Sequence, residues 1–380
     1  MWYVRTMCWK STEKKQLEKG GNIISMEKVL MKGNEALAEA VIRSGCRFYG
    51  GYPITPQNEI LEYISWRMPE VGGAFVQAES ELAAINMVLG AASAGARALT
   101  SSSGPGYSLF QEGISYLVAG DIPAVIIDVA RFGSGIGEIS QGQCDYKLVT
   151  RGNGHGDSHL LVLAPCSVQE SVDLMMQAFP LAEKYRHPVI LLSDAAIGQM
   201  VEPVNLPEPQ TVDINRDAWT VKGCKGQDES KKITNVFYYM DDYNSYLRDK
   251  YQKMQEEEQR WESIMTEDAQ LILVAYGISA RVCKEAVRMA REKGVRLGLI
   301  RPISIFPYPG KAFKNIPDSC KALMTVEMSI TGQMAEDVRL AVNCRYPVYT
   351  YGTGIKVPGS SDVVRYASDI IEGKIDKEVF

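Results

Sequence analysis

Apolar residues along this chain recur in two patterns, short continuous runs and longer stretches with helical spacing. The runs predict strands and the spaced positions predict amphipathic helices, which alternate regularly up to residue 201. The predicted strands are Arg47–Tyr52, Ala74–Gln77, Arg97–Ser101, Ala124–Val129, Leu160–Leu163 and Pro188–Leu192, and the predicted helices are Asn34–Ser44, Gln57–Arg67, Glu79–Ala94, Tyr107–Val118 and Val168–Lys184. This alternation predicts a doubly wound, mostly parallel α/β sheet.

The pattern is interrupted after residue 201 and then resumes. Pro203, Pro207 and Pro209 break regular structure, and a charged stretch follows, with a solvated helix predicted at Tyr251–Ile264. Alternation resumes with strands at Gln270–Tyr276, Val295–Ile300 and Lys321–Glu327 and helices at Ala280–Lys293 and Gln333–Val342. We therefore expect a leader or upstream start at 1–25, a first domain at 26–201, a linker and excursion at 202–267, and a smaller α/β domain at 268–380.

Composition and charge exclude several classes of protein. The 380 residues carry a net charge of −5 with acidic and basic residues interspersed, so no nucleic-acid surface is expected. No apolar run is long enough to cross a bilayer, and residues 1–25 contain no apolar core of signal-peptide length. The eight cysteines are scattered without any Cys-x-x-Cys pair, which argues against an iron–sulfur or structural zinc site in this chain. Reduced thiols and a cytoplasmic location are the expectation.

Four turns rich in glycine and polar residues stand at the ends of predicted strands. They are Gly50–Pro56, Gln77–Glu81, Thr100–Gly106 and Asp128–Arg131. In an open α/β sheet, the carboxyl ends of parallel strands line the crevice in which ligands bind. We therefore expect the four turns to form one catalytic site.

Glu81 is the first candidate catalytic residue because it leads into a helix that is nearly all apolar or small. A carboxyl group in apolar surroundings is less easily ionised, so it can share a proton with a nitrogen of a ligand. The alternative is that Glu81 and the nearby Glu79 both lie in water at the helix N-terminus, where negative charge is favourable.

Thr55 and Arg131 are candidates for binding a carboxylate. Pro53 and Pro56 stiffen the turn around Thr55, which would fix its hydroxyl and N–H groups, although a plain turn is the alternative. Arg131 ends a buried strand and precedes several glycines, and a guanidinium there could bind a carboxylate through two hydrogen bonds. It could equally pair with a neighbouring acid such as Asp128.

The serine-rich turn Ser101–Gly106 precedes a helix, so its N–H groups could receive an anion or polar atoms of a ring. It lacks the Gly-Lys-Ser/Thr of a P-loop, and no G-x-G-x-x-G motif follows the first strand. A nucleotide site of either type is therefore not expected. Gly154–Asp157 and His159 could reach the same crevice. A structural role is the alternative for each histidine.

Taken together, these motifs resemble the alpha-type subunits of 2-oxoacid:ferredoxin oxidoreductases. The matching stretches are Gly51–Pro56, Gln77–Asn86, Thr100–Gly106, Val129–Arg131, Gly154–Asp157, Arg301–Pro307, Glu327–Ser329, Gly332–Met334 and Tyr351–Gly354. The resemblance covers nearly everything from Met26 to Gly373. Within the family, Gln-Ala-Glu-Ser-Glu and Gly-His-Gly-Asp look most like the branched-chain enzyme that acts on 3-methyl-2-oxobutanoate.

The resemblance implies an enzyme that decarboxylates a 2-oxoacid with thiamine diphosphate, passes electrons through iron–sulfur clusters to ferredoxin, and releases an acyl-CoA. It implies a pyrimidine-type thiamine diphosphate-binding domain followed by a transketolase C-terminal-like domain. Glu81 matches the glutamate that bonds the pyrimidine nitrogen, while Thr55 and Arg131 match residues that face the substrate. The implied cofactor-binding residues are Glu81, Pro53, Ile54, Ser102, Ser103 and Gly104, with no metal ligand in this chain.

The motifs that are missing imply partner chains. No Gly-Asp-Gly followed by asparagine is present to hold Mg²⁺ and the diphosphate, and no cysteines are clustered for [4Fe-4S] binding. The resemblance therefore implies a beta-type subunit that holds Mg²⁺, a ferredoxin-like subunit, and a gamma-type subunit as a further candidate. Alternatives for the substrate are pyruvate and 2-oxoglutarate, because the motifs of this chain differ from those expected of the branched-chain enzyme at Phe132, Ser134, Gly104 and Tyr107. Alternatives for the function are a transketolase or E1-type enzyme half and an inactive scaffold.

Overall fold

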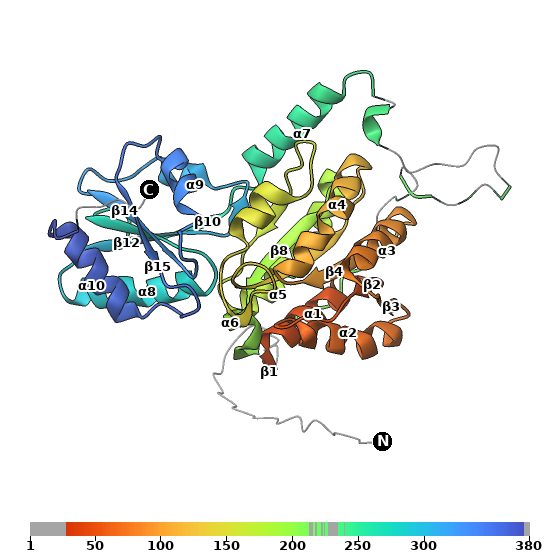
Figure 1. Cartoon of the computed structure of the whole chain (residues 1–380), viewed down its shortest axis with the longest axis horizontal. Helices are drawn as coiled ribbons and strands as arrows, with labels where there is room; N and C mark the ends of the chain where they lie inside the picture. Colours follow the sequence, from red (N-terminus) through yellow and green to blue (C-terminus); the bar gives the residue numbers. More distant parts are fainter. Residues whose placement is uncertain are drawn as a thin grey trace, which may run out of the picture.

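The computed structural model describes residues 28–375 apart from 213–215, 217, 218, 222, 224, 227–234 and 239. The leader predicted at 1–25 lies outside these residues. The chain forms two α/β units that lie side by side, with α7 (Tyr243–Glu257) projecting beyond the larger unit (Figure 1). No helix in the described ranges is both long and apolar enough to cross a membrane.

The larger unit is built on a sheet in the order β13-β7-β8-β5-β4-β2-β3, with β6 paired to β5. Its neighbours are parallel except for the pairs β13–β7 and β5–β6. The strands are β2 (Phe48–Gly51), β3 (Ala74–Gln77), β4 (Ala98–Ser102), β5 (Val125–Phe132), β6 (Glu138–Gln141), β7 (Leu161–Leu163), β8 (Val189–Asp194) and β13 (Ser304–Phe306). The predicted doubly wound, mostly parallel sheet is confirmed.

Helices cover both faces of this sheet because its central strands are apolar on both sides. In β5, Ile126 and Ala130 pack into the cluster formed with α3 and α4, whereas Ile127 and Val129 pack with α1, α2 and α5. The helices are α1 (Gly33–Arg43), α2 (Asn58–Glu70), α3 (Glu81–Ser93), α4 (Pro105–Ala119), α5 (Val168–Tyr185) and the short α6 (Ala195–Gln199). The polar Asp128 is therefore buried on the α3/α4 face of the central strand.

The smaller unit is a second sheet in the order β10-β12-β11-β14-β15, parallel except for β10. Its elements are β10 (Trp261–Ile264), β11 (Leu271–Val274), α8 (Gly277–Glu292), β12 (Leu297–Pro302), β14 (Ala322–Glu327), α9 (Ala335–Ala341), β15 (Val348–Gly352) and α10 (Ser360–Ile371). Helices α8 and α10 cover one face, and the other face joins the apolar cluster of the larger unit.

The helix predicted at Tyr251–Ile264 is wrong in its second half. The helix α7 ends at Glu257, and Trp261–Ile264 instead forms the edge strand β10 against β12. This strand depends on backbone pairing with residues 299–302, a partner that helical periodicity does not detect. Upstream, Val201–Val204 forms β9 and pairs with β1 (Val29–Lys32) as a two-stranded ribbon. Pro203 is tolerated because it lies in an edge strand.

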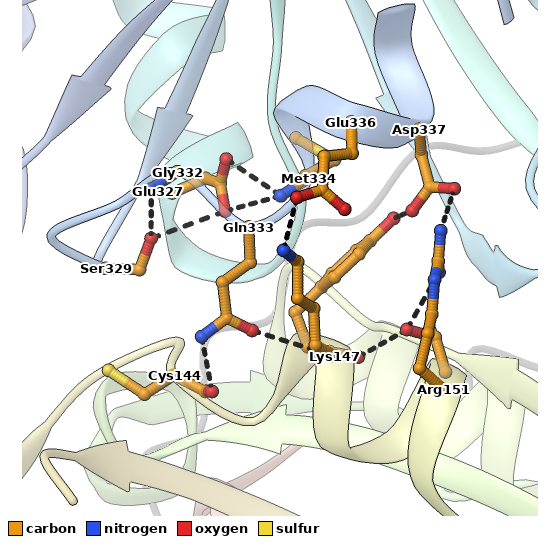
Figure 2. Close-up of polar contacts among 12 residues, drawn as sticks. Cys144, Lys147, Arg151, Glu327, Ser329, Gly332, Gln333, Met334, Glu336 and Asp337 are labelled. Carbon is orange, nitrogen blue, oxygen red and sulfur yellow. Dashed lines mark hydrogen bonds and ion pairs between the residues drawn. The ribbon is translucent and has the colours of Figure 1, made fainter. Parts of the chain in front are cut away.

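The two units meet at a junction rich in hydrogen bonds (Figure 2). The Gln143 amide donates to the Tyr276 carbonyl at 3.0 Å and accepts from the Ser279 hydroxyl at 2.7 Å and from the Met328 N–H at 3.0 Å. Gln333 reaches back to the Cys144 carbonyl at 2.8 Å. Because Gln143 and its three partners are buried, leaving any of these groups unpaired would be costly, and the junction fixes the loop that follows β6.

Ion pairs continue this junction toward α9. Lys147 pairs with Glu336 at 2.5 Å and Arg151 with Asp337 at 2.5 Å (Figure 2). The Lys147–Glu336 pair is exposed and contributes little on its own. At the end of β14, the buried Glu327 carboxylate accepts a hydrogen bond from the Met334 N–H at 3.0 Å and holds the loop after β14 in place.

Candidate functional site

The four turns singled out in the sequence lie at one edge of the larger sheet. Strands β2, β3, β4 and β5 run parallel, so their carboxyl ends fall on the same side. Residues 52–56 follow β2, Glu81 follows β3, Ser103 and Gly104 follow β4, and Arg131 stands near the end of β5. The edge therefore has the geometry of a ligand crevice in an open α/β sheet.

Glu81 is the first residue of α3, and its side chain is only 6% exposed. Ser80 caps the helix by accepting the Ala83 N–H at 3.2 Å, which leaves the Glu81 carboxylate free to point elsewhere. Glu79, in contrast, is exposed. The alternative of two solvated glutamates thus describes Glu79 but not Glu81.

The Glu81 carboxylate lies against the start of α4. A Cβ atom added to Gly106 would stand 2.4 Å from Glu81 Oε1 and 2.0 Å from Ser102 Oγ. Glycine is therefore required for this close approach of backbone, hydroxyl and carboxylate. Three turns that are distant in the sequence meet here.

Arg131 is also buried, with 6% of its surface exposed. Its guanidinium donates to the Thr55 carbonyl at 2.7 Å and to the Ile136 carbonyl. Burial lowers its pKa from the ordinary value, and the nearby Asp145 and Glu81 oppose this change. No described residue accepts a hydrogen bond from its Nε. The guanidinium is thus held by neutral carbonyls rather than by an ion pair with Asp128.

The proline-flanked turn is tied to the neighbouring strand. Pro53 is exposed, whereas Ile54 and Thr55 are half-buried. The Gln57 N–H donates to the Ile54 carbonyl at 3.1 Å, and the Gln57 side chain accepts from the Ser101 hydroxyl at 2.6 Å. Gln57, which sequence reasoning did not select, therefore fixes the position of Thr55 relative to β4.

Several hydroxyl groups of β4 and its turn are buried without partners. Among the described residues, Thr100 Oγ1, Ser102 Oγ and Ser103 Oγ neither donate nor accept a hydrogen bond. Buried unpaired polar atoms are rare because each costs about 1–3 kcal/mol. Ser102 Oγ lies beside Glu81 across Gly106, and such buried unpaired hydroxyls are what a site for the polar edge of a ring would require.

Two buried acids near Arg131 were not selected as site residues by the sequence. Asp128 is 0% exposed and Asp145 6% exposed. Burial and the adjacent Asp145 raise the pKa of Asp128 well above its ordinary value, and burial raises the pKa of Asp145 to about 6. Asp145 lies in a loop without periodicity, so only the fold brings it to the crevice.

The histidine candidates do not all reach this edge. His159 precedes β7, and its carbonyl contacts the ring of His187, which precedes β8. Both rings therefore lie at the opposite, amino-terminal edge of the sheet. There the ring of His159 also stacks on that of Phe306, with 5.0 Å between the ring centroids. His155 is exposed. The expectation that His159 could reach the crevice is wrong because the chain crosses the sheet between residues 145 and 159.

A cavity of about 480 Å³ lies at that opposite edge, between the two units, lined by His159, Phe306, Tyr308 and Asp337 among others. It is separate from the crevice around Glu81. Within the described part of the chain, no group of three or more His, Cys, Asp or Glu side chains is arranged to hold a metal ion.

Comparison with known families matches most of the chain. The family model described as "Pyruvate flavodoxin/ferredoxin oxidoreductase, thiamine diP-bdg" matches residues 39–267. The model described as "Pyruvate:ferredoxin oxidoreductase core domain II" matches residues 269–363.

Individual relatives agree with these models. The chain is 48% identical over 320 residues to "Ketoisovalerate oxidoreductase subunit VorB" of Methanothermobacter thermautotrophicus, covering 83% of this chain and 90% of the relative. It is 35% identical over 339 residues to "2-oxoglutarate synthase subunit KorA" of Methanocaldococcus jannaschii, covering 82% and 91%.

A solved structure has the same fold. The structure "2-oxoglutarate:ferredoxin oxidoreductase from Magnetococcus marinus with 2-oxoglutarate, coenzyme A and succinyl-CoA bound" superposes with a TM-score of 0.80 at 26% identity. The match covers 91% of this chain but only 65% of that longer chain.

Proposed function

Because the chain belongs to the pyruvate flavodoxin/ferredoxin oxidoreductase family, we propose that it is the alpha-type subunit of a 2-oxoacid:ferredoxin oxidoreductase that acts on 3-methyl-2-oxobutanoate. The observation that carries the proposal is the meeting of buried Glu81, buried Arg131 and the Thr55 turn at one sheet edge. The substrate follows from the similarity to the ketoisovalerate subunit, and 2-oxoglutarate is the second candidate because of the KorA relatives.

The crevice fits the pyrimidine half of thiamine diphosphate. Glu81 would face a ring nitrogen, and the unpaired hydroxyls of Ser102 and Ser103 with the Gly104 backbone would meet its polar edge. When bound, this cofactor supplies the electron sink that makes loss of CO₂ possible. Glu81 would hold or release a proton toward the ring nitrogen, and its burial would exclude water from that hydrogen bond.

Arg131 and Thr55 would orient the substrate. The Arg131 Nε–H remains available to a carboxylate while the other guanidinium nitrogens are fixed by carbonyl groups. Neutral carbonyl partners leave the positive charge uncompensated by an ion pair, so it can attract the oxoacid. A moderate attraction is required, because an interaction that favours the bound carboxylate more than the transition state slows decarboxylation.

The remaining parts of the reaction are assigned to partner chains. A beta-type subunit would hold Mg²⁺ and the diphosphate, and a ferredoxin-like subunit would carry the [4Fe-4S] clusters to ferredoxin. A gamma-type subunit is a further candidate partner, and CoA is the acyl acceptor. The scattered cysteines support a cytoplasmic complex.

The domain division 26–201, 202–267 and 268–380 is part of the proposal. The two family models meet between residues 267 and 269, which supports a boundary there. One strand does not follow this division in space: β13 (Ser304–Phe306), within residues 268–380, pairs with β7 of the larger sheet.

The experiment that tests the function is purification of the chain with its co-encoded partners. Viologen reduction is then measured with thiamine diphosphate, CoA and each of three oxoacids: 3-methyl-2-oxobutanoate, 2-oxoglutarate and pyruvate. The highest kcat/KM is expected with 3-methyl-2-oxobutanoate. A preference for either other acid would reassign the substrate, and dependence on a lipoyl protein in place of ferredoxin would reject the family reaction.

Replacing Gly106 with alanine is expected to disable this site without unfolding the chain. The new Cβ would collide with Ser102 Oγ and Glu81 Oε1 and displace the carboxylate, so kcat should fall by about 100-fold or more. Turnover and the thermal unfolding midpoint are measured together. Gly90→Ala is the matched control, because Gly90 lies within α3 and its added Cβ meets no atom within 4 Å. Comparable losses of turnover in both variants would contradict the prediction.

A further inference from the structure

A pair of carboxyl groups, Asp128 and Asp145, lies beside Arg131 and has no role in the proposed reaction. Asp128 belongs to the central strand β5 and faces the α3/α4 side of the sheet, as its neighbours Ile126 and Ala130 do. Asp145 reaches the same place from the loop after β6, and Gln143 anchors that loop to the smaller unit. Two acids from separate segments are thus fixed in one buried position.

Three of the four carboxylate oxygens of this pair lack the donors that an ionised buried carboxylate needs. Among the described residues, none donates a hydrogen bond of normal geometry to Asp128 Oδ1, Asp128 Oδ2 or Asp145 Oδ2. Two unprotonated carboxylates cannot bond to each other, whereas a proton placed between them gives each an otherwise missing partner. Apart from the backbone N–H groups of Gly104 and Arg131, no donor acts on the pair among the described residues, and this scarcity favours a shared proton.

Gly104 shows how close this pair is to the substrate-facing guanidinium. A Cβ built on Gly104 would stand 3.8 Å from Arg131 Nε and 3.8 Å from Asp145 Oδ2. The unpaired donor and the unpaired acceptor thus flank the same backbone position. A substrate carboxylate that approaches Nε would come close to the Asp145 carboxyl group.

The charges around the pair do not balance. Arg131 is the cation that influences Asp145, and the other titratable groups close to this centre are acids, phenols and a thiol: Glu81 on α3, Asp128 on β5, Tyr107 on α4, Cys144 in the loop, and Tyr276 before α8. A bound oxoacid adds one more negative charge. Several uncompensated charges in a buried site are costly, and taking up a proton removes one of them.

We propose that Asp128 and Asp145 share one proton in the free enzyme and take up a second when the carboxylate of the oxoacid binds beside Arg131. The inference rests on the proposed function, since it requires a carboxylate substrate. Asp145 is the group that receives the incoming proton, because the charge of the Arg131 guanidinium acts on it and because it is less buried than Asp128. It acts as a positioning residue that sets the charge around Arg131.

The direction of the pKa shifts agrees with this assignment. Burial raises the pKa of Asp145 to about 6, and the Gly104 and Arg131 backbone N–H groups limit the rise. Below about pH 6 the pair is already fully protonated, so binding requires no uptake. Above that pH a proton must be taken up with the ligand, and the affinity falls by up to about tenfold per pH unit.

The test uses the assembled complex with thiamine diphosphate and with 3-methylbutanoate, a carboxylate that cannot be decarboxylated. Titration calorimetry at pH 7.5 in two buffers of different ionisation enthalpy gives the number of protons taken up per bound ligand. The parent complex is expected to take up close to one proton, and Asp145→Asn none. The affinity of that variant should be the same at pH 6 and pH 8.

Asp194→Asn is the matched control. Asp194 is another buried acid whose pKa burial raises to about 6, but its carboxylate is satisfied by the N–H groups of Ile197 and Ile278. Its replacement is expected to leave proton uptake at the parent value. Loss of uptake in this variant would show a general effect of buried acids and overturn the assignment to Asp145.

The parent complex alone also tests the inference if a variant fails to assemble. The proposal of a proton-sharing carboxyl pair is overturned if the KM for the oxoacid does not rise between pH 6 and pH 8. It is also overturned if Asp145→Asn takes up as many protons on ligand binding as the parent complex. Either result with normal oxoacid turnover leaves the proposed function intact. Absence of turnover with every oxoacid overturns the proposed function instead.

Discussion

Replacement of Glu81 with glutamine is expected to lower the turnover of the oxoacid by about a thousandfold while the complex still assembles. Glutamine preserves the size of the side chain and its place against Gly106 but cannot exchange a proton with a ring nitrogen. The loss should therefore appear in kcat. It is measured as steady-state viologen reduction at saturating thiamine diphosphate, with assembly checked by size-exclusion chromatography.

Glu79→Gln is the control for this variant, because Glu79 precedes the same helix but is exposed. It should retain parent turnover. Normal activity of the complex that carries Glu81→Gln would remove the catalytic role of Glu81 and would favour an inactive scaffold. Equal losses in the two variants would indicate a general effect of charge at the start of α3.

Truncation of Arg131 to alanine is expected to lower kcat/KM for the oxoacid by about 100- to 1000-fold, with unchanged affinity for thiamine diphosphate. Charge-assisted contacts to a carboxylate in a buried site are worth several kcal/mol, and alanine removes them entirely. The cofactor should be unaffected, because the proposed ring contacts come from Glu81 and the β4 turn. Steady-state kinetics and cofactor titration by fluorescence quenching measure the two quantities.

Arg47→Ala provides a matched control for Arg131. Arg47 also donates to backbone carbonyls, those of Ile42 and Cys46, but it is exposed and precedes β2 at the opposite edge of the sheet. Its loss should leave kcat/KM at the parent value. A large fall in thiamine diphosphate affinity in Arg131→Ala would contradict the assignment of this residue to the substrate.

Local patterns in the sequence predicted the elements that carry the site. The strands that end near Gly51, Gln77, Ser102 and Phe132 are marked by continuous apolar runs and by the turns after them. Once these strands are taken as parallel, their carboxyl ends must share an edge, so Glu81 and Arg131 are expected to be neighbours. The motif resemblance added the chemistry, which periodicity alone does not contain.

The parts that were missed depend on contacts between distant segments. Asp145 gains its position from the Gln143 hydrogen bonds to the smaller unit, and no local pattern in residues 133–156 encodes that partner. Strands β10 and β13 are short and depend on pairing with β12 and β7. The burial of Glu81 rather than Glu79 likewise depends on a distant segment, because Glu81 packs against Gly106 at the start of α4.

The Gln143 amide has a consequence for how substrate enters. Gln143 belongs to the larger unit, and its side chain bonds Tyr276, Ser279 and Met328 of the smaller unit. It stands just after β6, the strand that pairs with Arg131. A hinge rotation of the smaller unit would break several buried bonds at once, so domain closure is disfavoured as a gating motion. The segment around Ile136 stands outside that junction: its side chain is 84% exposed, and its carbonyl accepts a hydrogen bond from the Arg131 guanidinium. Entry of substrate past this segment would require no rotation of one sheet against the other.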